Sequence, residues 1–167
     1  MITTIDEFVS DWRKVWSTTL RHLETLTDAS LEQRVAEGHR TLGRVAWHIA
    51  QTIPEMMNRT GLEVVGPAED APVPGTAREI AEAYREASRS LLEQVGSRWT
   101  DESLEAQDEM YGRQWKRSET LSALLGHEIH HRGQMTVLMR QAGLRVPDSF
   151  GPAREDWAQM GMEPPAV

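Results

Sequence analysis

The stretch SETLSALLGHEIHHRGQMTVLMRQAG, residues 118–143, predicts a single long helix. Apolar side chains recur along it at the three- and four-residue spacing that places them on one helical face. The helix is expected to run from about Ser118 to Ala142 and to stop at Gly143, with Pro147 behind it, because glycine favours the left-handed conformation that closes a helix. Its predicted core face carries Leu121, Leu124, Leu125, Met135 and Met139.

Three more helices are predicted upstream by the same period. The first follows Thr4 and the third follows Thr76, each with a glutamate three residues later as in a capping box. The second begins directly after Thr41 and ends before Gly61. Residues 61–75 hold several glycines and prolines and no helical period, so they are predicted to form one long connection between helices two and three.

The short segments outside the helices carry two further patterns. LTDASLE (26–32) and WTDESLE (99–105) share Thr-Asp-x-Ser-Leu-Glu, and each precedes another helix, which suggests two helical hairpins related by duplication. Residues 105–117 are irregular, with a small hairpin expected at Gly112. No convincing run of strands is present, so we expect an all-α fold in one domain, residues 1–167: a four-helix bundle with one long connection between helices two and three and short irregular segments.

Composition excludes several classes of function. The 167 residues carry a formal charge of -8, and no basic run is longer than Lys116-Arg117, so neither nucleic acid nor an anionic membrane is an expected partner. The absence of cysteine rules out a thiolate metal site, a nucleophilic protein thiol and disulfides. The N-terminus lacks the apolar core of a signal peptide, and no 18 consecutive residues are apolar, so a cytoplasmic protein is expected.

Three of the six histidines fall within residues 127–131. Residues four apart on a helix lie nearly above one another, so His127 and His131 can direct their imidazoles to one point. His130 lies far around the helix and is expected to be exposed or at a subunit contact. A catalytic zinc-like site usually has three protein ligands, and His48, mid-helix beside an apolar stripe, is the best third candidate. The remaining two are expected to be ordinary surface or capping residues: His22 and His39.

Glu128 falls within the predicted core face of the fourth helix, where a carboxylate requires a partner. One interpretation is a partly buried ion pair with Arg132, four residues on. The other makes Glu128 a catalytic acid or base, or a group that orients His131 or a ligand. Gly133, inside the helix, suggests close approach of another backbone or a ligand.

Residues 127–131 also match HExxH, the metalloprotease pattern in which the glutamate is the general base. Such proteases normally couple that helix to a sheet that binds peptide, and the sequence shows no such strands. The longer metzincin pattern fails as well, with Met135 and Val137 in the region it would need. A peptidase is therefore the less favoured interpretation.

WHIAQ around His48, YG at 111–112 and HEIHHRGQMTVLMRQAGLRVPDSFGP at 127–152 together resemble the DinB-like superfamily of metalloenzymes over almost the whole chain. The resemblance implies a four-helix bundle, commonly a homodimer, with a divalent metal held by one histidine of helix two and two of helix four. In this sequence the resemblance assigns these ligand positions to His48, His127 and His131. The spacing of the histidines favours the same three residues. Relatives with established activity are metal-dependent transferases and isomerases that use low-molecular-weight thiols such as bacillithiol or mycothiol.

These features predict a metal-dependent thiol S-transferase acting on a small-molecule electrophile, as in detoxification and stress response. The divalent ion is expected to be zinc or nickel, although imidazole also suits copper and iron. Trp47, Tyr111 and Trp115 either line the electrophile pocket or serve in packing. Two alternatives stay open: a hydrolase in which Glu128 or Glu55 moves the proton, and a non-catalytic, stress-associated metal-binding dimer with Glu55 as a possible fourth ligand.

Overall fold

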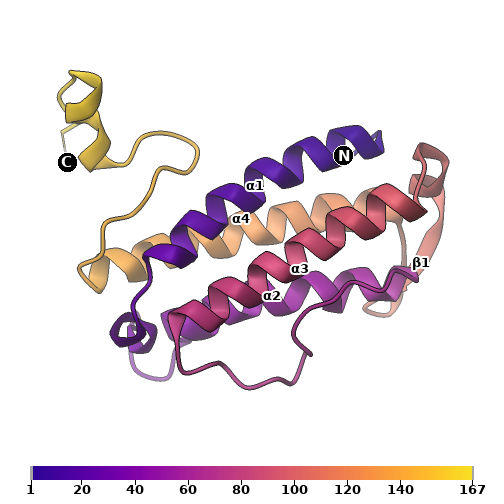
Figure 1. Ribbon diagram of the computed structural model, residues 1–167, viewed down its shortest axis with the longest axis horizontal. Coiled ribbons are helices and arrows are strands. Elements are labelled where there is room, and N and C mark those ends of the chain that lie inside the picture. The colour runs from indigo at the N-terminus through magenta and orange to yellow at the C-terminus, as the bar shows by residue number, and fades with distance from the viewer. Residues whose placement is uncertain (1, 167) are drawn as a thin grey trace.

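The computed structural model describes residues 2–166 and shows a bundle of four long helices (Figure 1). The all-α prediction is therefore confirmed. The long helices are α1 (Ile5–Thr25), α2 (Leu42–Met57), α3 (Ala77–Arg98) and α4 (Arg117–Gln141). The α1 helix packs against α3 and α4, and α2 packs against the same two, so α1 and α2 lie diagonally opposite.

The predicted helix starts are confirmed by side-chain caps. The hydroxyl of Thr4 accepts a hydrogen bond from the backbone N–H of Glu7 (3.1 Å), and Thr41 and Thr76 cap α2 and α3 in the same way. Each cap satisfies a donor that has no partner within the helix. At the other end of α4, Gly143 has a φ of 74°, as expected of a glycine that closes a helix.

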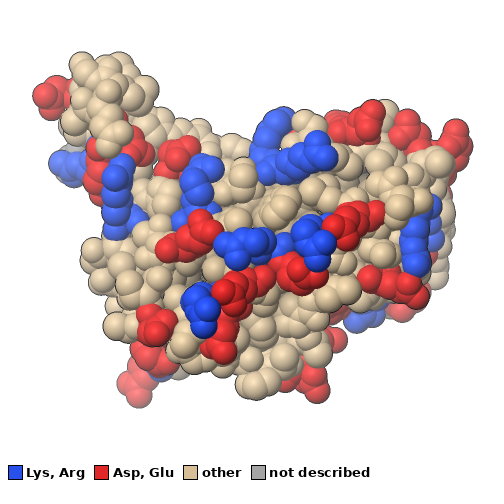
Figure 2. Space-filling view, in the orientation of Figure 1, with Lys and Arg blue, Asp and Glu red and all other residues tan. Residues whose placement is uncertain are grey.

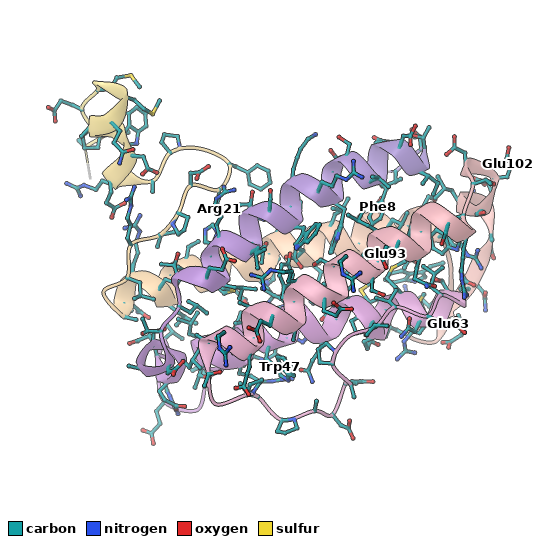
Figure 3. All side chains as sticks on the ribbon, viewed as in Figure 1. Phe8, Arg21, Trp47, Glu63, Glu93 and Glu102 are labelled. Carbon is teal, nitrogen blue, oxygen red and sulfur yellow. The ribbon has the colours of Figure 1, made fainter. Side chains whose placement is uncertain are left out.

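The long connection between α2 and α3 runs back along the bundle, so these two helices point in the same direction (Figure 1). Gln51 holds this connection against α2, because its side-chain amide donates to the carbonyls of Ala68 (2.8 Å), Glu69 (2.9 Å) and Ala71 (3.1 Å). Trp47 points toward the same connection and donates its indole N–H to Ala71 (3.0 Å; Figure 3). These bonds fix the wall of the bundle next to His48.

Two strands, β1 (Gln107–Met110) and β2 (Arg113–Lys116), form an antiparallel hairpin, so the hairpin expected at Gly112 is present. Gly112 has a φ of 80° and Tyr111 a φ of 53°. The repeated Thr-Asp-x-Ser-Leu-Glu segments form two short 3₁₀ helices, η1 (Asp28–Glu32) and η3 (Asp101–Glu105), each with a threonine and a serine three residues apart at its start. Their origin by duplication stays a prediction.

The chain continues beyond α4 into a segment that passes beside the C-terminal half of α1 and leads into a 3₁₀ helix, η4 (Arg154–Met160), which stands away from the four long helices (Figure 1). Arg140 of α4 pairs with Glu155 of η4 at 2.8 Å. The segment beside α1 covers His22, whose ring lies 2.8 Å from the carbonyl of Thr18 and 3.1 Å from the hydroxyl of Ser149. The prediction of a surface or capping role for His22 is wrong, because this residue is fully buried.

Acidic and basic side chains alternate over the face formed by α1 and α3 (Figure 2). They form ion pairs on and beside α3, such as Arg89–Glu93 at 2.7 Å and Arg85–Glu24 at 2.7 Å. This face therefore shows no continuous basic patch. Within residues 2–166, no helix combines the length and the apolar character needed to cross a bilayer.

Candidate metal centre

Three imidazoles from two neighbouring helices meet at one point. The Nε2 atom of His48 on α2 lies 3.2 Å from Nε2 of His127 on α4, and the latter lies 3.1 Å from Nε2 of His131. All three ligand atoms fall within 4.8 Å of one another. The structure thus brings together the three residues that the spacing and the resemblance predicted, and the arrangement is that of a possible metal site.

The donor set fits a divalent transition ion. Zinc takes imidazole nitrogen at about 2.0–2.1 Å in tetrahedral geometry, which sets two ligand nitrogens roughly 3.3–3.4 Å apart. The measured separations of 3.2 and 3.1 Å are within a few tenths of an ångström of that value. Three imidazole nitrogens can all direct lone pairs at one point only if a cation lies between them, and their spacing is that of ligands around such an ion.

The histidines are neutral donors at neutral pH. Burial, together with the smaller effect of the neighbouring histidines, lowers the pKa of His48 and of His127 to about 4. The pKa of His131 is also lowered, chiefly by burial. A metal ligand must be deprotonated, so little work is needed to free these nitrogens for an ion.

Gln134 orients one of the ligands. Its side-chain oxygen lies 2.7 Å from Nδ1 of His131, which fixes the proton on Nδ1 and leaves Nε2 as the lone pair facing the cluster. The amide nitrogen of Gln134 lies 3.1 Å from Nε2 of His130. Sequence reasoning missed this role, although the position one helical turn beyond His131 could have indicated it.

Two of the three histidines, His48 and His127, border a cavity of about 520 Å³ that opens beside α2 and the hairpin. Tyr111 and Trp115 line it, as one reading of the sequence proposed, whereas Trp47 is buried and does not. Glu55 also lines the cavity, but its carboxylate pairs with Arg59 (2.8 Å) and accepts a hydrogen bond from Tyr111 (2.7 Å).

No fourth histidine or carboxylate among residues 2–166 joins the three ligands. A structural zinc site is normally closed by four protein donors, whereas a catalytic one keeps a position open. The number of protein ligands is therefore that of an open site. Glu55 forms an ion pair with Arg59 instead of acting as a fourth ligand.

Glu128 lies on the other side of α4 from the cavity. Its side chain is only 1% exposed, and it accepts a hydrogen bond from the hydroxyl of Tyr84 on α3 (2.6 Å). Burial raises the pKa of Glu128 to about 7, against the opposing effect of that hydrogen bond. The glutamate of HExxH thus faces the bundle core, which disfavours the peptidase interpretation, and a catalytic role for Glu128 stays a prediction.

The predicted ion pair between Glu128 and Arg132 is wrong: no nitrogen–oxygen contact within 4.0 Å joins them in the described chain. The guanidinium of Arg132 instead donates to Thr19 (3.1 Å) and to the carbonyl of Val15 (3.4 Å), both on α1. The physical reason is that Tyr84 of α3 bonds to Glu128 while groups of α1 accept the hydrogen bonds of Arg132, although the two residues lie one turn apart on α4.

The remaining predictions concern His130 and Gly133 on α4 and His39 before α2. His130 is exposed, as predicted. No other part of the described chain approaches Gly133, because a Cβ atom added there would meet nothing within 4 Å, and approach of a ligand or of a second copy stays a prediction. His39 is exposed, in agreement with its predicted surface position.

Comparison with known proteins places these observations in a family. The model of the DinB family matches residues 1–165. The chain is 43% identical to uncharacterized protein YrdA of Bacillus subtilis (strain 168), over the full length of both chains. It is similar to the crystal structure of a DinB-like protein from Bacillus cereus ATCC 10987, with 46% identity, a TM-score of 0.86, and 89% of this chain and 99% of that chain covered. A DinB-like protein from Bacillus subtilis, YjoA, shares the fold at 19% identity, with a TM-score of 0.69, covering 88% of this chain and 99% of that one.

Proposed function

The chain belongs to the DinB family, and from that premise we propose that it is a metal-dependent thiol S-transferase. In the proposed reaction a small thiol attacks a carbon electrophile: a carbon–sulfur bond forms, the bond to the leaving group breaks, and the thiol proton is released. The observation that carries the proposal is the convergence of three neutral imidazoles at the edge of a cavity large enough for a small molecule.

The charge of the site supports thiol chemistry. A divalent ion held by three neutral imidazoles would keep its full positive charge and acidify a thiol at the open position, supplying a thiolate near neutral pH. The chain has no cysteine, so the thiol must be a separate low-molecular-weight cosubstrate. Zinc or nickel suits three imidazole donors.

The residues of the chain have distinct supporting roles. Gln134 holds the ring of His131 with Nε2 toward His127. Tyr111 closes the hairpin side of the cavity, with its hydroxyl bonded to Glu55 and its ring under the guanidinium of Arg59, 5.0 Å from the ring centroid. A tyrosine at a φ of 53° is strained relative to glycine or asparagine, and such strain often occurs beside functional sites.

The hydrolase alternative needs a general base near the open position. Glu128 is hydrogen bonded to Tyr84 in the core, and Glu55 is neutralised by Arg59. Neither carboxylate is free to take a proton from a bound water, so we place the transferase ahead of the hydrolase. The closed, non-catalytic site is disfavoured because Glu55 does not join the histidines.

We also propose that the protein acts as a homodimer in the cytoplasm and serves in stress-associated detoxification. The family resemblance supports these points, and the exposed apolar side chain of Val137 on α4 (54% exposed) offers a surface that a second copy could cover. Sedimentation equilibrium would test the dimer, with a mass of one chain as the contradicting result.

The transferase proposal is tested by assaying zinc- or nickel-loaded protein with a small thiol and a chromogenic halonitroarene. We expect thioether formation above the uncatalysed rate for the wild type, its loss in His127→Ala, and its retention in His130→Ala, where the exposed neighbouring imidazole is removed. Metal-loaded protein that hydrolyses esters but transfers no thiol would contradict the proposal in favour of the hydrolase.

A further inference from the structure

The cavity beside His48 and His127 has a cationic end. Arg40, just before α2, and Arg44, in its first turn, both line this cavity. Arg44 precedes His48 by four residues, so the two side chains lie on the same face of α2. The positive charges therefore lie beside the open position of the metal centre.

Neither arginine is neutralised by the protein. Most arginines of the described chain lie within 4.0 Å of a carboxylate, including Arg59 on the opposite side of the same cavity. Within residues 2–166, neither Arg40 nor Arg44 has a carboxylate oxygen within 4.0 Å of its guanidinium nitrogens. Two glutamates line the same cavity, but Glu55 is already paired with Arg59, so the two guanidinium groups without an ion-pair partner face Glu69 as the one remaining lining carboxylate.

Arg44 is also held in place. Its Nη1 atom donates to the side-chain oxygen of Gln51 at 2.6 Å. Gln51 is 3% exposed and is fixed in turn by the three carbonyls of the long connection. A guanidinium that is positioned before the ligand arrives loses less conformational freedom on binding, so this arrangement suits recognition better than a free surface arginine does.

Arg40 lies where two hollows meet. It lines the first cavity and also a second one of about 500 Å³, which His131 borders and whose remaining walls are mostly apolar. Its charge also lowers the pKa of all three histidines, which is consistent with a guanidinium close to the cluster. The apolar walls of the second hollow are Val35, Val45, Val137 and Leu138.

We propose that Arg40 and Arg44 form a carboxylate-binding subsite, so that the ligand which reaches the metal centre through the first cavity is a small molecule with a carboxylate group. Arginine pairs well with carboxylates through its planar fork of donors. A singly charged group fits better than a phosphate, because Glu55 and Glu69 line the same cavity and would repel a second negative charge. The identification of this ligand as the thiol rests on the proposed function.

The subsite is tested with two thiols of similar size, 3-mercaptopropionate, which carries one carboxylate, and 3-mercaptopropan-1-ol, titrated against cobalt-substituted protein while the cobalt absorption bands are followed. Wild-type protein should bind 3-mercaptopropionate at least tenfold more tightly than 3-mercaptopropan-1-ol. Arg40→Gln and Arg44→Gln should each weaken the binding of 3-mercaptopropionate roughly tenfold or more and leave that of 3-mercaptopropan-1-ol unchanged, since a hydrogen bond to a charged group is worth at least that much. Arg13→Gln, an exposed change on the diagonally opposite helix α1, is the control and should alter neither.

Butyrate separates this inference from the thiol chemistry, because it carries one carboxylate and no sulfur. Calorimetric titration should show butyrate binding to the metal-loaded wild type and at least tenfold weaker binding to the Arg40→Gln/Arg44→Gln double variant. Affinities for butyrate and 3-mercaptopropionate that do not change in the double variant would overturn the subsite. Cobalt bands that respond to neither thiol, together with normal butyrate binding, would retain the subsite and reject the thiol function.

Discussion

The buried carboxyl of Glu128 should make the stability of the protein depend on pH in a characteristic way. Its side chain is 1% exposed, and no ion pair within the described chain neutralises it. Burial raises its pKa in the folded protein from an ordinary 4.5 to about 7. The informative change is Glu128→Gln, because glutamine keeps the shape and an oxygen that can accept the hydrogen bond from Tyr84 but cannot titrate.

The sign follows from proton binding. Between pH 4.5 and 7 the folded protein holds the proton of Glu128 more tightly than the unfolded chain does, so this contribution to stability is fully present below pH 4.5 and is lost as the pH rises through 7. At about 1.36 kcal/mol per pH unit, the free energy of unfolding should fall by roughly 3 kcal/mol over this range. For a chain of this size that corresponds to roughly 6–12 °C in Tm.

Urea unfolding of the wild type and Glu128→Gln at a series of pH values from 4.5 to 8 measures this effect. The free energy of unfolding of the variant minus that of the wild type should increase by roughly 3 kcal/mol toward high pH, and any constant cost of the amide cancels in that trend. Glu82→Gln, on the exposed surface of α3, is the matched control and should show no such trend. A difference that stays flat across the series would refute the reasoning, because the carboxyl would then be solvated or paired.

Three further outcomes follow from the geometry. Gln134→Ala should weaken metal binding about 10- to 100-fold in competition with a chromophoric chelator, because His131 loses the partner that fixes its tautomer; unchanged affinity would remove Gln134 from the site. Gly133→Ala should raise stability by about 1 kcal/mol in chemical denaturation, since the new methyl group meets nothing within 4 Å, and a loss instead would indicate that a second copy packs there. Gly43→Ala should destabilise by about 1–3 kcal/mol, because its Cβ atom would lie 3.1 Å from Cβ of Leu31 and 3.2 Å from its carbonyl; a neutral result would show that η1 can move away.

Local patterns predicted the helices and the ligands because both depend on short-range geometry. The caps at Thr4 and Thr76 and the stop at Gly143 are properties of a few neighbouring residues. His127 and His131 share a helical face by spacing alone, whereas His48 required either an argument about ligand number or the family resemblance.

The errors arose where a side chain is satisfied by a distant segment. His22 is buried because residues near Ser149 pack against α1, and nothing local to α1 indicates that contact. Glu128 and Arg132 have the spacing of an ion pair on one helix. Instead, Glu128 accepts a hydrogen bond from Tyr84 of α3, and Arg132 donates one to Thr19 of α1. The packing of the helices determines these hydrogen bonds, and the local spacing of residues does not.

The central claim is that His48, His127 and His131 hold one divalent ion. Its most direct test is the metal content per chain, by mass spectrometry, of protein purified without a metal-binding tag, for the wild type and for the alanine variants of these three residues and of His130. We predict about one ion per chain in the wild type and in His130→Ala, and its loss in each of the other three variants. Wild-type protein that contains no ion and takes up neither zinc nor nickel would contradict the claim.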